Sequence, residues 1–358
     1  MKTHRNIIYI ALNIVNHHVF VTFFKSWLIP SFVTLTVPMF QGCSKQAHSQ
    51  DSSFTEMPPK TSVKLAVLSN SRMPIKSVDA LVYNNDILQR IDCYQRFENM
   101  DYQTLMIGSG GGMKKIALCA NSQWDKDEWK TADSYHNLKK MKASLEKENR
   151  NFPLMSSVIT IHAGDDTTDI KMERISSIIQ LNSVRCDFSG KPYEGECISD
   201  ARVYLTNISG RCNIIEHDSD KIETIINHGG LINEDLKSFN DSSLIIKNIG
   251  IVNTDKSYPQ AELLCYPNTV EHETAGTPFT RLVIEGKVQG ERWYWPININ
   301  RGAGGDHEGI KSNMTYSYDI VITRKGTKDP DAPITIEMAD VVLKTETWID
   351  KEEYFVAF

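Results

Sequence analysis

The chain has 358 residues, of which 41% are hydrophobic and 23% are charged, an ordinary composition for a folded protein. Its net charge of −6 gives no basic footprint of the kind that nucleic-acid recognition needs, so a nucleic-acid partner is not expected. At about 150 residues per domain, the length predicts two domains once a leader is removed.

An export signal is predicted at residues 1–42. Lys25 precedes an apolar run, and the run ends at a glycine that is followed by Cys43. A basic flank, an apolar stretch and a small residue before the cleavage point are the layout of a signal peptide. A cysteine in this position resembles a bacterial lipobox, which implies that Cys43 carries a lipid. The alternative is a membrane-spanning helix, and Pro30 and Pro38 inside the run argue against it.

Residues 43–60 are polar and contain a double proline, which predicts a flexible tether between the lipid and the first domain. Six cysteines follow, and an even number in an exported protein permits disulfides whose pairing the sequence cannot choose. Cys119 and Cys265 lie in strand-like runs, where a cysteine is equally well explained as a small buried hydrophobe. No two of these cysteines form a CxxC pair, so a zinc site is not indicated.

Period-2 alternation of apolar residues dominates the rest of the chain and predicts half-buried strands. The clearest examples are residues 63–67, 78–82, 316–322 and 334–338. Many short strands between clusters of Gly, Pro and Asn favour an all-β fold with two tandem β-sandwich domains of transthyretin-like or Greek-key type. We place these domains at residues 61–170 and 171–358.

Two helices are expected within this all-β framework. Leu138, Met141 and Leu145 follow helical spacing, with lysines and glutamates on the opposite face, which predicts a helix over residues 125–150. A shorter helical segment is expected at residues 221–239, interrupted by a pair of glycines.

Two loop motifs could carry chemistry, and each has a simpler explanation. The segment Gly108–Gly112 is glycine-rich like a phosphate-binding loop, but it lacks the GK[ST] ending and leads into a strand, so a hairpin turn is favoured. Asp165, Asp166 and Asp169 could ligate calcium, but they lack EF-hand spacing, so a solvated turn is favoured. The prediction is no metal and no cofactor.

Enzymatic activity is not expected, and no catalytic residue is assigned. The histidines are scattered and the sequence contains no HExxH or GxSxG motif. A Ser-His-Asp triad stays open, because its members need not be adjacent in sequence. Trp293 and Trp295 could stack on sugar rings, but they can also share one face of a strand as packing residues, which we favour.

The order of the lipobox, the two β-domains and the strings ERWYWPININ and YSYDIVITRKGTKDPDAPI resembles the fimbrillin family, the FimA-like subunits of Bacteroidetes type V pili. The strand SVDALVYN and the later strand MKKIALCAN are similar to that family's N-terminal domain. The resemblance covers nearly all of the chain after Cys43. It implies an outer-membrane lipoprotein precursor that becomes a subunit of a cell-surface fimbrium and supports cell adhesion.

The resemblance also implies a mechanism of assembly, donor-strand exchange. A trypsin-like protease would cut between Arg72 and Met73, and the strand carrying Val63, Leu65 and Val67 would leave. A strand from another fimbrial subunit would then fill the groove by strand addition. The implied donor is the C-terminal segment, with its alternating residues Val341, Leu343, Ile349, Tyr354, Val356 and Phe358.

Other functions remain open at this point. The chain could be the anchor or the tip subunit of the same fimbrial system. From a different class, it could be a surface glycan-binding lipoprotein that uses Trp293 and Trp295.

Overall fold

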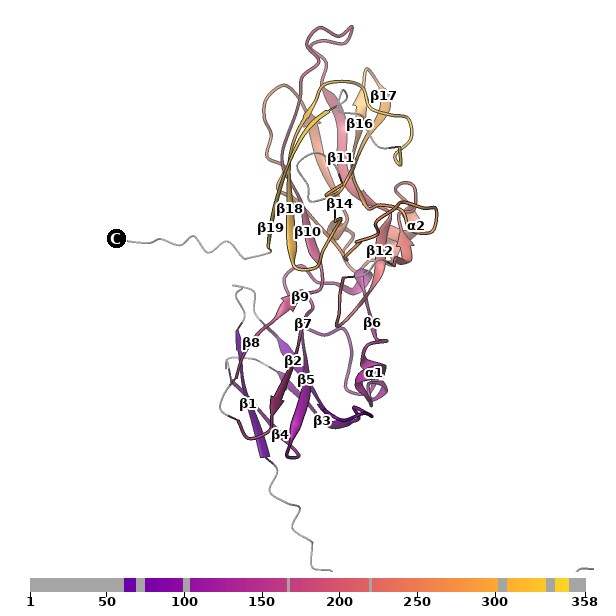
Figure 1. Cartoon of the computed structure of the whole chain (residues 1–358). Coiled ribbons are helices and arrows are strands. Elements are labelled where there is room, and N and C mark those ends of the chain that lie inside the picture. Colours follow the sequence, from indigo (N-terminus) through magenta and orange to yellow (C-terminus); the bar gives the residue numbers. More distant parts are fainter. Residues whose placement is uncertain are drawn as a thin grey trace, which may run out of the picture. The chain divides into compact units, whose positions relative to one another are not determined.

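The computed structural model describes residues 61–68, 75–98, 104–165, 168–218, 221–301, 308–332 and 339–347. Over these residues the fold is all-β, as predicted, with strands arranged in five sheets and two short α-helices (Figure 1). None of the helices in the described ranges is long and apolar enough to cross a membrane.

Two sheets are formed only by strands that lie before residue 175. The three-stranded sheet has the order β4-β1-β8, with β4 at Thr104–Ser109, β1 at Thr61–Leu68 and β8 at Thr168–Lys171. The five-stranded sheet has the order β3-β2-β5-β7-β9. Its strands are β3 (Ile91–Glu98), β2 (Ser77–Asn84), β5 (Met113–Ala120), β7 (Met155–His162) and β9 (Glu173–Arg174).

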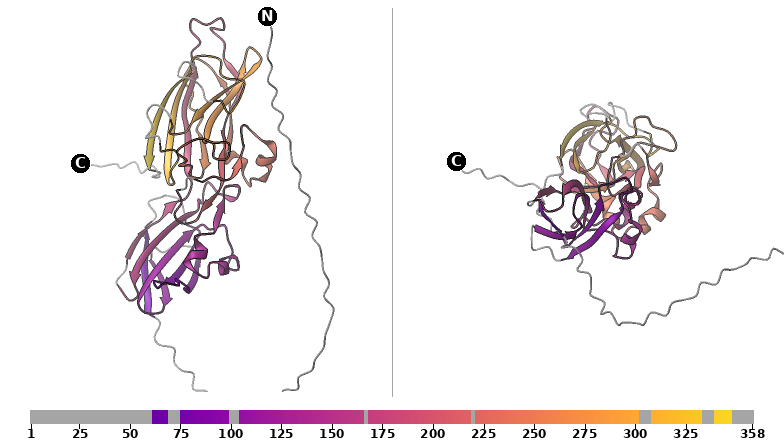
Figure 2. Two further views of the ribbon diagram at one scale, coloured as in Figure 1. Left: turned by 45° about the vertical axis from the view of Figure 1, so that its right-hand side comes forward. Right: turned by 60° about the horizontal axis from the view of Figure 1, so that its bottom comes forward.

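Later strands form two four-stranded sheets, seen from further sides in Figure 2. One contains β15 (Ala261–Cys265), β10 (Ser177–Cys186), β18 (Met314–Ile322) and β19 (Ala339–Thr347), in that order. The other contains β14 (Ile246–Val252), β11 (Ile198–Thr206), β16 (Arg281–Val288) and β17 (Glu291–Asn298).

The fifth sheet joins β13 (Glu223–Ile226) and β12 (Ile208–Asn213) to β6 (Lys142–Ser144). Because β6 and β12 pair across residue 170, a strand ladder links the two predicted domains. The division into domains at residues 170 and 171 therefore stays a prediction.

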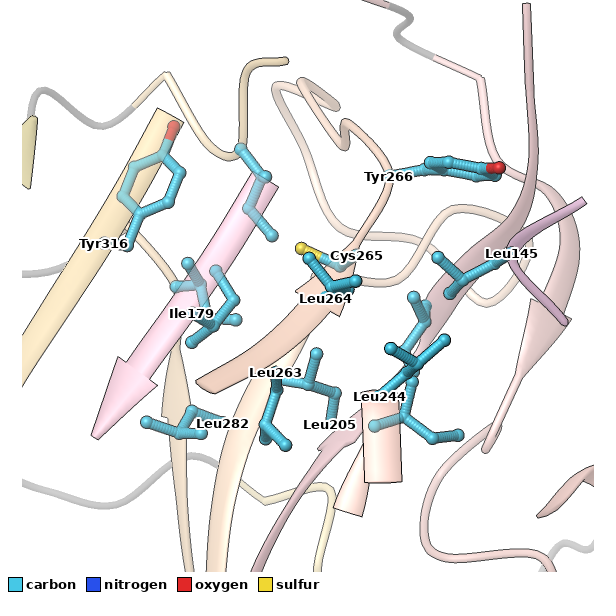
Figure 3. Close-up of a cluster of buried hydrophobic side chains, with 14 of the residues drawn as sticks. Leu145, Ile179, Leu205, Leu244, Leu263, Leu264, Cys265, Tyr266, Leu282 and Tyr316 are labelled. Atoms are coloured by element: carbon cyan, nitrogen blue, oxygen red, sulfur yellow. The ribbon is translucent and has the colours of Figure 1, made fainter. Parts of the chain in front are cut away.

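Two hydrophobic clusters fill the interior. The smaller, which we call the N-terminal core, consists of Val78, Ala80, Val82, Leu105, Ile107, Ile116, Leu118, Ala120, Met155, Ala163, Ile170 and Met172. The larger cluster includes Leu81 and Tyr83 on the other face of β2, together with most buried residues after position 175; Figure 3 shows part of it around Leu263. Strand β2 is therefore buried on both faces, which explains why its apolar residues run almost continuously.

The long helix expected at residues 125–150 does not form, and that prediction is wrong. The segment instead contains two 3-10 turns, at Glu128–Thr131 and Leu145–Lys147, the one-turn helix α1 at Tyr135–Leu138, and β6. Leu138 and Leu145 are buried, as members of the larger cluster. In this segment, burial of Leu138 and Leu145 and the pairing of β6 with β12 outweigh the weak local preference for a continuous helix.

The second helical segment is partly realised. Residues 221–239 contain strand β13, followed by helix α2 at Asn233–Ser238 after the glycine pair. The Gly108–Gly112 segment joins β4 directly to β5, but these two strands lie in different sheets and do not pair, so it is a turn between two sheets and the prediction of a hairpin is wrong. Gly112 has φ of +91°, a conformation that glycine adopts without steric cost.

Glu148 carries a buried carboxyl group that contacts Tyr266. Its Oε1 accepts a hydrogen bond from the Tyr266 hydroxyl at 3.0 Å, and its Oε2 accepts one from the Leu154 amide at 3.3 Å. Burial raises the pKa of Glu148 from 4.5 to about 7, because the charged form loses its hydration. The folded state therefore favours the protonated acid below about pH 7.

Glu148→Gln should remove the contribution of this carboxyl group to the pH dependence of the free energy of unfolding. The folded pKa lies above the unfolded one, so the stabilising contribution of Glu148 is present below pH 4.5 and is lost as the pH rises through about 7. As the pH rises through this range, the free energy of unfolding of the wild type should fall by about 3 kcal/mol relative to that of the variant. Urea unfolding of both proteins between pH 5 and 8 measures the difference. A difference that does not change with pH would contradict the assignment.

Candidate functional site

Strand β1 occupies the middle of its sheet, between β4 and β8. It pairs antiparallel with β4 through six residue pairs, from Thr61 opposite Ser109 to Ala66 opposite Thr104. It pairs parallel with β8 through four residue pairs, ending with Leu68 opposite Lys171. Strand β1 is therefore not an edge strand. Its position between two partners, which we call the β1 slot, holds it on both sides.

The β1 slot lies beside buried apolar residues of the N-terminal core. The register places Val63, Leu65 and Val67 opposite Ile107, Leu105 and Ile170, respectively. These three partners are at most 1% exposed. Met106, between two of them on β4, is 58% exposed, so β4 has one buried and one exposed face.

The partners of β1 are the site residues that sequence analysis missed. Leu105 and Ile107 alternate on β4, but the alternation is short and adjoins the glycine turn, so it did not stand out. Strand β8 has only four residues, and its single buried residue is Ile170. Such a strand gives almost no periodic signal, and its parallel pairing with β1 joins residues about 100 positions apart in sequence.

The predicted processing site lies outside the described residues. Arg72 and Met73 fall between the end of β1 at Leu68 and the start of β2 at Ser77. The lipid-bearing Cys43, the signal peptide at 1–42 and the tether at 43–60 also lie outside them.

Two residues of the predicted donor segment are described. Val341 and Leu343 lie on β19, opposite Ile320 and Tyr318 of β18, and both pack against the larger cluster. Strand β19 is the last strand in the order of its sheet, and nine residue pairs hold it to β18. The other predicted donor residues, Ile349, Tyr354, Val356 and Phe358, lie outside the described residues.

A serine and a histidine do come together, at the rim of a depression of about 420 Å³ lined by Tyr135, Lys171 and Glu173 among others. Ser156 Oγ lies 2.6 Å from His217 Nε2, and the same nitrogen lies 3.1 Å from the Ile214 carbonyl oxygen. A carbonyl oxygen only accepts, so Nε2 carries the hydrogen and has no lone pair to take the serine proton. The contact is therefore a structural hydrogen bond, without the geometry of a general base and its nucleophile.

Burial also lowers the pKa of His217, because the protein interior disfavours the charged imidazolium. The ring is thus held neutral at neutral pH. Its contribution to stability is present above the unfolded pKa of 6.5 and decreases as the pH falls below that value.

The two tryptophans of the ERWYWP string serve as packing residues. Trp295 is fully buried, and its Nε1 donates to the Arg324 carbonyl oxygen at 2.9 Å. Trp293 packs against the larger cluster, and the Lys328 ammonium lies 3.5 Å from the centroid of its ring. The buried Trp295 cannot stack on a sugar, and Trp293 is partly buried with a lysine over its ring, so packing accounts for both side chains.

The cysteines and the groups of possible metal ligands were the remaining candidate sites. Cys119, Cys186, Cys197, Cys212 and Cys265 are free thiols. Cys119 and Cys265 are fully buried in β5 and β15, as small hydrophobes. Within the described ranges, no three His, Cys, Asp or Glu side chains are grouped so that they could hold a metal ion.

No protein-family model and no curated protein matches the chain in sequence. Solved structures do match its fold. A fimbrilin (fimA) of Porphyromonas gingivalis W83 superposes with a TM-score of 0.62 at 15% identity, covering 82% of this chain and 99% of that one. A protein of Parabacteroides distasonis ATCC 8503 assigned to cell adhesion gives a TM-score of 0.60 at 15% identity, covering 83% of this chain and 99% of that one.

A further cell-adhesion assignment accompanies a similar structure from Bacteroides eggerthii DSM 20697. Its TM-score is 0.59 at 14% identity, and the match covers 81% of this chain and 96% of that one. The chain therefore has the fimbrilin fold over most of its length, as the sequence resemblance implied.

Proposed function

We propose, on the basis of the fimbrilin fold, that this chain is a structural subunit of a cell-surface fimbria and supports cell adhesion. In this proposal the precursor is a lipoprotein of the outer membrane, acylated at Cys43. A trypsin-like protease cleaves between Arg72 and Met73, β1 leaves, and a strand of a neighbouring subunit takes its place. The partners are thus further copies or other subunits of the fimbria, and the chain has no catalytic role.

The central position of β1 is the observation that carries the proposal. An edge strand could leave without opening the sheet. Loss of β1 would instead open a slot between β4 and β8, with unpaired backbone groups on both sides. Exposed, unpaired strand edges are templates for strand addition.

The energy available for refilling the slot is large. Departure of β1 would uncover Leu105, Ile107 and Ile170, at roughly 1.5–3 kcal/mol for each side chain taken out of the core. The lost ladder bonds add about 0.5–1.5 kcal/mol each. A trimmed subunit is therefore strongly driven to accept another strand, and the resulting joint would dissociate slowly without a covalent link.

The donor in this proposal is the tail that follows β19. Donation by β19 itself would first break its nine residue pairs with β18 and expose part of the larger cluster. The alternating residues Tyr354, Val356 and Phe358 come after the end of β19 at Thr347, so their donation would leave the pairs between β18 and β19 in place. Val341 and Leu343 then act as the base from which the tail extends.

Arg72→Ala tests the cleavage step. Purified precursor treated with trypsin at low dose should give a product that begins at Met73 and forms polymers resistant to mild detergent. The variant should keep its N-terminal strand and stay monomeric, with at least a tenfold loss of polymer. Lys60→Ala is the matched control, because it removes a trypsin site on the other side of β1. Normal polymers from Arg72→Ala would overturn the proposed cleavage site.

Cys43→Ala tests the lipid anchor. Because the acyl chain would be attached to the cysteine sulfur and to the new N-terminus, the variant should incorporate no radiolabelled palmitate and should be lost from the outer-membrane fraction. Cys93→Ala removes a thiol from the folded part and should label normally. Equal labelling of both variants would contradict the lipoprotein assignment.

A further inference from the structure

The loop between β2 and β3 exposes apolar side chains that the fold does not use. Ile87 is fully exposed and Leu88 is 66% exposed, and Met113, at the start of β5, is 47% exposed. We call these three residues the apolar tip. A lone exposed apolar residue is ordinary, but the adjacent side chains of Ile87 and Leu88, both in solvent, make this loop a candidate contact surface.

The tip is presented by an ordered turn. Asp86 Oδ1 accepts hydrogen bonds from the Leu88 amide at 3.0 Å and from the Gln89 amide at 2.7 Å. Gln89 has φ of +45°, and its carbonyl oxygen accepts from the Tyr135 amide at 3.0 Å. These bonds fix the backbone on both sides of Leu88, so the apolar side chains cannot fold back easily onto the sheet.

Backbone contacts place the tip at the mouth of the β1 slot. The Asn85 amide donates to the Met113 carbonyl oxygen at 3.1 Å, which joins the loop to the start of β5. Strand β5 follows the turn after Ser109, and Ser109 pairs with Thr61, the first residue of β1. The apolar tip and the beginning of β1 therefore lie at the same end of the two sheets.

A charged network connects the tip to the turn at this end. The Gly110 amide donates to Asp92 Oδ2 at 2.8 Å, and the ammonium of Lys114 lies 3.1 Å from the same oxygen. Lys114 also donates to Asn84 Oδ1 at 2.6 Å, at the base of the loop. Asp92 and Lys114 therefore neutralise each other beside the apolar tip.

We propose that the apolar tip is a contact surface for the body of a second copy of this chain in the fimbria. The inference rests on the proposed function. A donor strand that preserves the antiparallel pairing with β4 and the parallel pairing with β8 must run in the direction of β1. It enters the slot where Thr61 now lies, so the donor's body lies against this end and covers Ile87, Leu88 and Met113.

The test compares two purified, trypsin-trimmed variants with the wild type. Ile87→Ser combined with Leu88→Ser should slow polymer growth at least tenfold, measured by light scattering, while the thermal unfolding midpoint of the monomer is unchanged. Ile251→Ser is the matched control, because Ile251 is 63% exposed on β14 and lies on a different sheet. It should polymerise at the wild-type rate.

Three outcomes would overturn the proposal and each has a different meaning. Equal growth of the double variant and the wild type would show that the tip is not a subunit contact. Normal growth combined with lost flotation on phosphatidylcholine vesicles would assign the tip to a lipid surface instead. A wild type that does not polymerise at all, even when trimmed to Met73, would reject the proposed function itself and the inference with it.

Discussion

Deleting Tyr354–Phe358 should leave a chain that folds normally but does not polymerise. The deleted residues follow the last described strand, which ends at Thr347, so both hydrophobic clusters and all described pairings are retained. Tyr354, Val356 and Phe358 alternate, and burying three such side chains in the slot of a neighbour contributes roughly 5–9 kcal/mol. Their loss should lower the association constant between two neighbouring subunits by more than a thousandfold.

Size-exclusion chromatography of the trimmed protein measures polymerisation, and a thermal melt measures whether the shortened chain folds normally. The control keeps the length of the tail and the three apolar positions, and replaces Lys351, Glu352 and Glu353 by serine. That variant should still polymerise. If the shortened chain polymerised as readily as the control, the donor would have to be another segment, and β19 would be the next candidate.

The strands that the sequence revealed are those with regular alternation or a strong apolar run. Strands β2, β18 and β19 lie within one or two residues of where the pattern of Val78–Val82, Tyr316–Ile322 and Val341–Thr347 places them. Each is long. Strands β2 and β18 bury at least one face on a core, and Val341 and Leu343 of β19 pack against the larger cluster, so the period-2 signal stays intact.

The missed features are those that depend on contacts between distant segments. Leu138 and Leu145 have helical spacing, but the sheet they cover decides their backbone, and the segment becomes short turns and a strand. The central position of β1 likewise depends on β8, four residues whose pairing with β1 closes a loop of about 100 residues. No local pattern encodes such a partner.

The candidate site was therefore foreseen in part. Val63, Leu65 and Val67 mark a strand, and the structure places that strand at Thr61–Leu68. What the sequence did not indicate is that the strand has two partners, which changes the physics of its departure. An edge strand would leave one row of open backbone groups, whereas β1 separates two strands that do not pair with each other. Sheet completion then needs a donor that fits both sides.

A peptide with the sequence of β1, Thr61–Leu68, should block polymer growth of the trimmed protein. It can remake the pairs with β4 and with β8, and it supplies the residues that the register places opposite Leu105, Ile107 and Ile170. The native strand is covalently attached and acts at a high effective concentration, so the free peptide must be added in excess. At saturation, the growth rate measured by light scattering should fall at least tenfold.

A control peptide distinguishes inhibition by binding in the β1 slot from inhibition by nonspecific binding. A control peptide with serine in place of Val63, Leu65 and Val67 keeps the length, the lysine and the ability to form backbone hydrogen bonds, but it lacks the three apolar side chains. It should not inhibit, because ladder hydrogen bonds alone give only about 0.5–1.5 kcal/mol each against the entropy of ordering the peptide. Equal inhibition by both peptides, or none by either at saturation, would mean that growth does not proceed through the position that β1 leaves.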